Sequence, residues 1–170
     1  MVKEIPLTQG QSTLVNGKNY DNLSKDKWYA GYNKHTKSYY AKRYSRKKDG
    51  TGSTEYMARR IMNAKKGDFV DHRNHDTLNN REENLRICTR TQNMHSIKHH
   101  KDTFASQYKG VTEYKVGEKR KKWRVQLRIN GKLIHLGLFE SEIDAAKVYD
   151  KKAKELFGEF KCLNFPEDAV

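Results

Sequence analysis

An acid, a histidine and two asparagines lie along residues 69–93 with a spacing that suits phosphodiester hydrolysis. Asp71 and His72 are adjacent, and Asn84 and Asn93 follow them. Hydrolysis needs an activated water, and an imidazole with a pKa of about 6.5 can take the proton. It also needs charge stabilisation at the leaving oxygen, and carboxylate and amide oxygens suit Mg²⁺ or a similar hard cation. The pattern therefore predicts metal-dependent phosphodiester cleavage.

The residues around this set predict a strand, a polar turn-rich loop and a second strand. Residues 69–70 are expected to enter the core as residues 71–72 leave it. Residues 79–80 are two asparagines, which can adopt the left-handed turn conformation. Leu85 and Ile87 are expected to share one face of the second strand. The carboxylate and the imidazole would then leave the end of the first strand.

A helix is predicted directly after the second strand. Thr89 and Gln92 have the spacing of a capping box, in which each side chain bonds the other residue's backbone. This start places Asn93 in the first helical turn, where its amide oxygen can meet the strand carboxylate.

The segment resembles the HNH endonuclease family, and most closely the homing endonucleases encoded by phages and introns. Their signature runs Asp-His, Asn-Arg-x-x-Asn-Leu-Arg and Gln-Asn, and it stands here at residues 71–72, 80–86 and 92–93. The resemblance implies that His72 is the general base and that Asp71 and Asn93 bind the metal. It further implies that Asn84 holds the hairpin loop in shape.

The resemblance extends upstream to residues 3–10 and 56–62, with one departure. Relatives carry a His-Arg pair where this chain has Ala58 and Arg59. A zinc site would present further His or Cys ligands, so we expect one Mg²⁺ (or Mn²⁺) per active site and no small-molecule cofactor. His75 and His95 are expected at the surface or just outside the site, and residues 99–100 on a solvated helix end.

The first 63 residues predict short strands at 5–7, 13–15, 28–32 and 39–44, with a hairpin turn at 16–17 and a helix at 54–63. Seven of the ten tyrosines fall here. A basic aromatic hairpin suits a DNA groove, whereas tyrosines also fill thin cores, and composition leaves both readings open. The expected DNA contacts are Lys42, Arg43, Arg46 and Arg59, with residues 47–48 beside them.

Charge points to a polyanionic partner. The chain carries 35 Lys and Arg against 21 Asp and Glu, a net charge of +14, and only 35% of its residues are hydrophobic. Double-stranded DNA is the favoured partner, and a membrane is not, because the basic residues do not line an amphipathic helix. Cys88 and Cys162 are expected to be buried thiols, and the protein is expected to be an intracellular, cytoplasmic monomer encoded by a phage or mobile element.

Residues 101–107 are interpreted as a linker, and residues 108–165 predict three strands and one helix capped by Ser141 and ended by Gly158. The stretches 108–111, 123–128, 136–139, 145–150 and 163–166 resemble the Apetala-type ethylene-response-factor DNA-binding domain, which is also found fused behind HNH nucleases. The resemblance implies a sheet in the major groove with a helix behind it. The predicted DNA-facing residues are Lys109, Thr112, Tyr114, Arg124, Gln126, Arg128 and His135. For the two arginines, a solvated strand face is the alternative, and Trp123 and Tyr149 are expected in the core.

The predicted fold class is α+β. A ββα-metal nuclease core at about 69–100 lies in a domain of residues 1–100 with a small antiparallel β region, and a three-stranded antiparallel sheet packed on one helix follows at 108–170. The predicted function is metal-dependent nicking or cleavage of duplex DNA, of the homing type. The alternatives are an inactive sequence-specific DNA-binding regulator and an RNA-directed protein.

Overall fold

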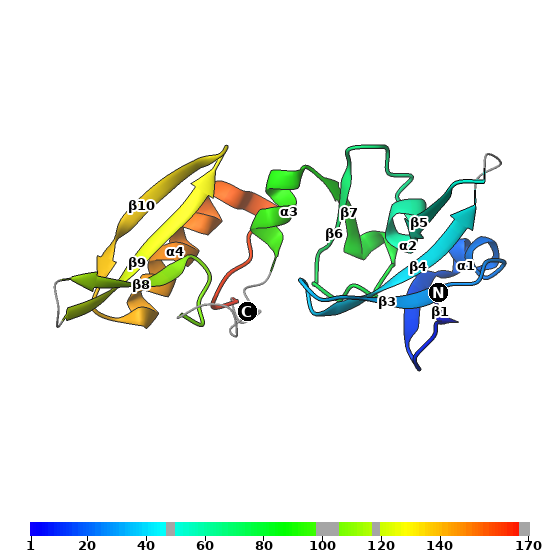
Figure 1. Cartoon of the computed structure of the whole chain (residues 1–170), viewed down its shortest axis with the longest axis horizontal. Helices are drawn as coiled ribbons and strands as arrows, with labels where there is room; N and C mark the ends of the chain where they lie inside the picture. Colours follow the sequence, from blue (N-terminus) through cyan, green and yellow to red (C-terminus); the bar gives the residue numbers. More distant parts are fainter. Residues whose placement is uncertain (47–49, 98–105, 117–119, 167–170) are drawn as a thin grey trace. The chain divides into compact units, whose positions relative to one another are not determined.

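The computed structural model describes residues 1–46, 50–97, 106–116 and 120–166. These residues form two compact units, Met1–Asn93 and Met94–Val170. Figure 1 shows several small antiparallel sheets and few helices, a mixture consistent with an α+β class. No helix in the described ranges has the length and apolar character needed to cross a membrane.

The described residues of the first unit form three small antiparallel sheets. They are formed by β1 (Val2–Pro6) with β2 (Ser12–Asn16), by β3 (Tyr29–Asn33), β4 (Ser38–Arg46) and β5 (Gly52–Tyr56), and by β6 (Phe69–His72) with β7 (Leu85–Cys88). The helices are α1 (Gly17–Leu23), α2 (Met57–Ile61), a short 3-10 turn η1 (Glu82–Asn84) and α3 (Arg90–Ser96). The boundary between the units falls within α3.

A thin apolar core joins the first two sheets to α1 and α2. Its buried members are Ile5, Val15, Leu23, Trp28, Ala41 and Met57. A core of this size agrees with the low apolar content of the chain and leaves much of the unit's stability to hydrogen bonds and ion pairs. Such a unit can bury polar side chains only where each has a partner.

Two local predictions in this unit are wrong. Residues 16–17 do not make a hairpin turn: Gly17 begins α1, and the Asn16 side chain bonds the Glu82 backbone N–H (2.7 Å) and the Glu83 carboxylate (2.9 Å). The predicted helix at 54–63 is helical only from Met57, because β5 pairs with β4 as far as Tyr56. In both places a partner distant in sequence outweighs the local preference.

The second unit is a three-stranded antiparallel sheet covered by one helix, as the sequence predicted. Its strands are β8 (Val111–Val116), β9 (Arg120–Ile129) and β10 (Lys132–Phe139) in the order β10-β9-β8, followed by α4 (Glu142–Phe157) and the turn η3 (Gly158–Phe160). The core consists of Val111, Val125, Leu127, Ala145, Ala146, Tyr149, Ala153 and Phe157, with Trp123 against it. The predicted core positions of Trp123 and Tyr149 are confirmed.

The ends of α4 confirm the expected caps. The Ser141 hydroxyl accepts a hydrogen bond from the Asp144 backbone N–H (3.2 Å), and Gly158 follows the last turn with φ 52°. Gly110, with φ +76°, lies so close to the helix that a Cβ there would come within 2.1 Å of the Tyr149 ring. The sheet and helix therefore depend on a residue without a side chain at this position.

Most of the expected linker lies outside the described residues, since only residues 106 and 107 are described. Ser106 is 1% exposed, and its hydroxyl donates to a carboxylate oxygen of Glu142 (2.8 Å). This residue is therefore part of the second unit's fold rather than of a loose connection.

Candidate active site

Asp71 lies in β6 directly opposite Arg86 in β7. The Nε and Nη2 atoms of Arg86 donate to the same carboxylate oxygen, Oδ2, at 2.8 and 2.6 Å. Both side chains are buried, with 8% of Asp71 and 7% of Arg86 exposed. Among the described residues nothing donates to the other oxygen, Oδ1. The carboxylate is thus charge-paired through one oxygen and open at the other.

The strand pair buries its polar residues, and the sequence-based expectation for residues 69–72 is wrong. Asp71 and His72 are buried, whereas Phe69 is 37% and Ile87 45% exposed. Leu85 and Ile87 also differ in burial, because Leu85 is only 3% exposed whereas Ile87 is 45% exposed. Burial of a carboxylate is costly unless it is paired, and Arg86 supplies that pairing across the ladder. The alternation of apolar residues could not reveal this, because the partner is on another strand.

A chain of hydrogen bonds fixes the proton on His72. The Thr13 hydroxyl donates its single hydrogen to the carbonyl of Leu78 (2.6 Å), so it must accept from the Asn80 side-chain NH₂ (2.8 Å). The amide oxygen of Asn80 then faces His72 Nε2 at 3.2 Å. An oxygen can only accept, and therefore Nε2 carries the hydrogen. The lone pair of neutral His72 is on Nδ1.

Burial lowers the pKa of His72 below its ordinary value of 6.5, against the opposing effects of the Asn80 hydrogen bond and of the charges on Asp71 and Asp76. The imidazole is consequently neutral at pH 7. A neutral imidazole whose Nε2 hydrogen is already donated can act as a base only through Nδ1.

Asn84 joins the two ends of the loop between β6 and β7. Its side-chain oxygen accepts from the Asn74 backbone N–H (3.0 Å), and its NH₂ donates to the Asn79 carbonyl (2.8 Å). These contacts are the kind that a loop-shaping residue makes.

The left-handed residue in this loop is His75, with φ 64°, and not residues 79–80 as the sequence suggested. Asn79 and Asn80 are instead buried, 4% and 1% exposed. The backbone of β2 holds them there, since Leu14 N–H donates to Leu78 and Asn80 N–H donates to Leu14 (2.9 and 2.8 Å).

Asn93 lies in α3 after the expected capping box, which is confirmed. Thr89 N–H donates to the Gln92 side-chain oxygen (2.8 Å), and Gln92 N–H donates to the Thr89 hydroxyl (3.2 Å). Within the described ranges no hydrogen bond joins the Asn93 amide to Asp71 or His72, so the predicted convergence of the three is not seen as a direct contact.

The oxygen donors suit a hard cation better than zinc. Asp71 offers Oδ1 and Asn93 offers its amide oxygen, and Mg²⁺ is commonly bound through one or two such ligands, with water and phosphate completing the shell. A closed zinc site needs more nitrogen or sulfur ligands than Asp71 and Asn93 supply. The part of the chain that the structure describes has no cluster of three or more His, Cys, Asp or Glu that could hold a metal of any kind. Cys88 and Cys162 are buried cysteines, as expected.

Beside this site, β4 carries the cations that the sequence assigned to DNA. Lys42 is half-buried, with Nζ 4.9 Å from the centre of the Tyr56 ring, and Arg46 is exposed. Arg43 pairs with Asp26 and Glu55. These ion pairs give Arg43 a structural use within the unit.

Arg59 is also occupied by its own unit. Its guanidinium donates to the backbone carbonyls of Asp68 and Lys65, the latter at 2.8 Å, and so ties the end of α2 to the turn before β6. Residues 47–48 and 99–100 lie outside the described residues.

The open face of the second unit's sheet carries most of the predicted DNA contacts. The cross-strand register aligns Thr112 with Arg124, and Gln126 with His135. The Thr112 hydroxyl and Arg124 Nε are buried without a hydrogen-bond partner in the described residues. The guanidinium of Arg124 lies over Tyr114, 5.3 Å from the ring centre. The Arg128 guanidinium is exposed and donates to the Gly131 carbonyl (2.9 Å).

Lys109 does not reach that face. Its ammonium donates to the carbonyls of His95 and Ile97 (the latter at 2.7 Å), and burial lowers its pKa. His95 stacks on Phe157 with ring centres 3.7 Å apart, and its Nε2 lies 3.0 Å from the Arg128 carbonyl. Both residues act in packing within the second unit.

Residues 64–95 match the family model described as HNH endonuclease. Residues 64–95 are thus similar to HNH endonucleases, and we call them the HNH segment. The chain is also similar to an uncharacterized HNH endonuclease of Acanthamoeba polyphaga mimivirus, with 36% identity over 96 residues that cover 56% of this chain and 46% of the relative. Two rice proteins named APETALA2-like protein 2, from Oryza sativa subspecies indica and japonica, are 33% identical over 86 residues, which is 48% of this chain and 19% of each.

The chain therefore spans less than half of the length of the viral relative and about a fifth of the rice proteins. No solved structure gave a significant match to it.

Sequence reasoning missed several residues around the HNH segment. Arg86 and Asn80 lie inside the recognised signature, but their roles depend on what they contact across the strand pair. Thr13 is far from the segment in sequence and carries no signal of its own. The bridge between Leu14 of β2 and Asn79, with the bond from the Thr13 hydroxyl to the Leu78 carbonyl, brings it to the site.

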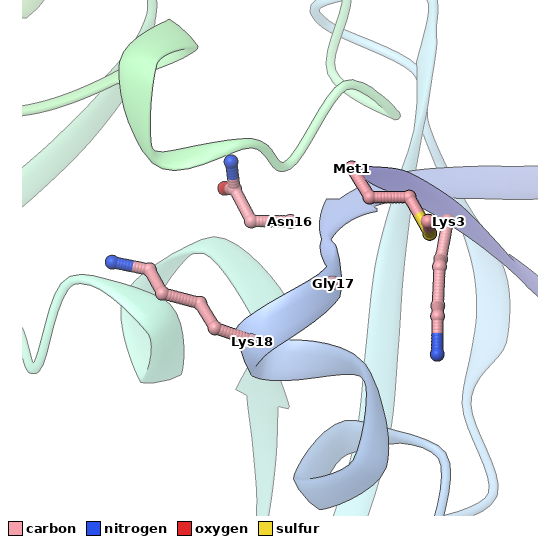
Figure 2. A pocket seen from close by; sticks show the side chains of 5 residues that line it. All are labelled: Met1, Lys3, Asn16, Gly17 and Lys18. Carbon is pink, nitrogen blue, oxygen red and sulfur yellow. The ribbon is translucent and has the colours of Figure 1, made fainter.

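A pocket of about 450 Å³ lies away from these groups. It is lined by Met1, Lys3, Asn16, Gly17 and Lys18, which Figure 2 shows around the junction of β2 and α1. Its cations are in use, because Lys18 pairs with Glu82 (2.6 Å) and Lys3 lies over Tyr20. None of the lining residues belongs to the HNH segment, and we assign this pocket no chemistry.

Proposed function

We propose that the chain is a metal-dependent DNA endonuclease in which the first unit cleaves and the second unit binds duplex DNA. The observation that carries the proposal is the arrangement inside the HNH segment. His72 is buried and neutral with Nδ1 as its base nitrogen, and the adjacent Asp71 keeps one carboxylate oxygen open. The match to the HNH endonuclease model supports the same reading.

In the proposed reaction, Nδ1 of His72 accepts a proton from a water molecule. The oxygen of that water forms a bond to phosphorus as the bond from phosphorus to the 3′ oxygen breaks, and the departing oxygen takes a proton from solvent. Asn80 holds the imidazole in place by accepting from Nε2–H. Asp71 and Asn93 would hold a divalent cation, preferably Mg²⁺, which when bound stabilises charge at the leaving oxygen.

The second unit is proposed to hold the substrate. A three-stranded sheet with Arg124, Gln126 and Arg128 on one face suits the wide major groove of B-form DNA and not the narrow one of A-form RNA. The rice relatives named APETALA2-like agree with the resemblance of residues 108–166 to the Apetala-type domain, and the viral relative named as an HNH endonuclease supports the nuclease proposal. One site per chain favours nicking by a monomer, and the homing role rests on the signature residues.

A catalytically inactive DNA-binding regulator is the second candidate. Ala58 is buried, 7% exposed, at the position where related nucleases carry a histidine. The neighbouring Arg59 is bound to backbone carbonyls. Loss of a histidine near the site is what a decayed nuclease would show.

A supercoiled-plasmid assay separates the two candidates. The native chain, His72→Ala and the matched control His35→Ala, which changes an exposed histidine, are incubated with EDTA, Mg²⁺ or Zn²⁺. We expect nicked or linear product from the native chain and the control with Mg²⁺, and none from His72→Ala, which should still retard duplex DNA. Binding without cleavage by the native chain under every metal would establish the regulator instead.

A further inference from the structure

The face of the β3-β4-β5 sheet beside His72 carries an aromatic pair and a lysine. Side chains alternate along a strand, so Tyr40 and Lys42 of β4 share one face. The register places Tyr56 of β5 opposite Lys42 and Gly31 of β3 opposite Tyr40. Tyr40 and Tyr56 meet edge to face, with ring centres 5.8 Å apart.

Glycine at position 31 lets the lysine lie flat on this face. A Cβ on Gly31 would come within 2.5 Å of Lys42 Cδ and 2.9 Å of Cε, so any larger residue would displace the lysine stem. The ammonium lies 4.9 Å from the centre of the Tyr56 ring and 5.8 Å from that of Tyr40. Two ring faces thus hold the cation in one place.

The same aromatic pair contacts the candidate general base. The Tyr40 ring meets the His72 ring edge to face at 6.4 Å between centres. Burial raises the pKa of the Tyr40 hydroxyl, and the charge of Asp71 adds to that effect. Lys42 and His72 therefore both lie against the ring of Tyr40.

The cation of Lys42 has no counter-ion among the residues that the structure describes. Neighbouring arginines are paired, Arg43 with Asp26 and Glu55, and Arg86 with Asp71. In the described ranges, no carboxylate lies within ion-pair distance of the Lys42 ammonium. A half-buried cation left unpaired beside a hydrolytic base is suited to an anion that arrives with the substrate.

We propose that Lys42 binds a non-bridging oxygen of the DNA phosphate at, or next to, the bond that is cut. The contact places that phosphate in front of His72 and neutralises part of its charge. This inference rests on the proposed nuclease function and assigns one step of it, the seating of the phosphate, to one side chain.

Single-turnover cleavage at saturating enzyme and Mg²⁺ tests the assignment. We expect Lys42→Met, which keeps an apolar stem over the two rings, to slow cleavage about 100-fold, the effect typical of losing one donor to a reacting oxyanion. Lys42→Arg should recover most of the rate. The control is Lys34→Met, which changes an exposed lysine in the turn between β3 and β4 and should leave the saturated rate unchanged.

A neutral methylphosphonate, introduced one position at a time around the mapped cleavage site, separates phosphate binding from a structural role. At the contacted position the native enzyme should slow to the rate of Lys42→Met, and the variant should slow no further. An unchanged saturated rate in Lys42→Met, or a defect that persists at every substituted phosphate, overturns the assignment while the nuclease function stands. No cleavage by the native enzyme overturns both.

Discussion

Two hydrogen bonds from the guanidinium of Arg86 reach Asp71 through one carboxylate oxygen, Oδ2, and no donor among the described residues reaches Oδ1. The pair is buried in a ladder of only four residues on each strand. A buried carboxylate next to a base can be stable before any metal arrives only if another cation balances it. Arg86 balances the charge of Asp71 and contacts Oδ2 of its carboxylate, so that Oδ1 can bind a metal.

Replacing Arg86 with Met should therefore destabilise the first unit by about 3 kcal/mol, because it leaves a buried charge unpaired. Urea unfolding at pH 7 measures the loss. Mg²⁺ should raise the melting temperature of this variant more than that of the native chain, since the cation replaces the missing charge at Asp71.

Two further variants check the cause. The double variant Asp71→Asn with Arg86→Met should recover part of the lost stability, and Arg90→Met, an exposed arginine of α3, should lose almost none. If Mg²⁺ raised the melting temperatures of Arg86→Met, the double variant and Arg90→Met equally, a metal at Asp71 would be contradicted.

Thr13 should affect the rate of cleavage although it lies outside the signature. Thr13→Val removes the hydroxyl that accepts from Asn80, so the amide can rotate and His72 is no longer held with its hydrogen on Nε2. We expect a loss of roughly tenfold or more in cleavage rate, as for other residues that orient a functional histidine, with DNA affinity unchanged. Thr13→Ser keeps the hydroxyl and should retain the native rate. A native rate in Thr13→Val would show that the relay is unnecessary.

The stability of the first unit should depend on Asp26 in a pH-dependent way. Hydrogen bonding by Arg60, together with Arg43, lowers the pKa of Asp26 below its ordinary value of 3.8. A carboxylate with a lowered folded pKa contributes stability above its ordinary pKa and loses it as pH falls through the folded value. Asp26→Asn should cost about 1 kcal/mol at pH 7, and the difference from the native chain should shrink as the pH falls below 3.8 towards the folded pKa. Urea titrations across this range measure it, and a constant difference would contradict the pairing.

Arg124 should matter for DNA binding by the second unit. Its Nε is buried without a partner in the described residues, and its guanidinium is oriented by Tyr114. Arg124→Ala should weaken duplex binding by about 1 to 3 kcal/mol if the side chain reads a base, and the loss should vary with sequence. A loss that is uniform across sequences, with a salt slope smaller by about one, would mark a phosphate contact instead. Lys147→Ala, on the exposed side of α4, is the control, and equal affinities of both variants would contradict the assignment.

The sequence by itself determined the order of the units and the chemistry to look for. The capping box of Thr89 and Gln92, the Ser141 cap and the alternation around Val125 are local patterns, because each depends on residues a few positions apart. The signature at residues 71–93 is equally local and names an acid, a base and an amide. Such features can be read from spacing alone.

Tertiary structure decided which atoms of those residues are available. Arg86, on the neighbouring strand, bonds Oδ2 of Asp71 and so determines which carboxylate oxygen stays open. Thr13 and Asn80 determine that the imidazole hydrogen of His72 is on Nε2. Lys42 lies against the Tyr40 ring, which also contacts His72. Gly31 and Tyr56, on the two neighbouring strands, hold it there. These contacts join residues far apart in the chain. The periodicity of the sequence does not predict them, because burial and pairing are properties of the assembled sheets.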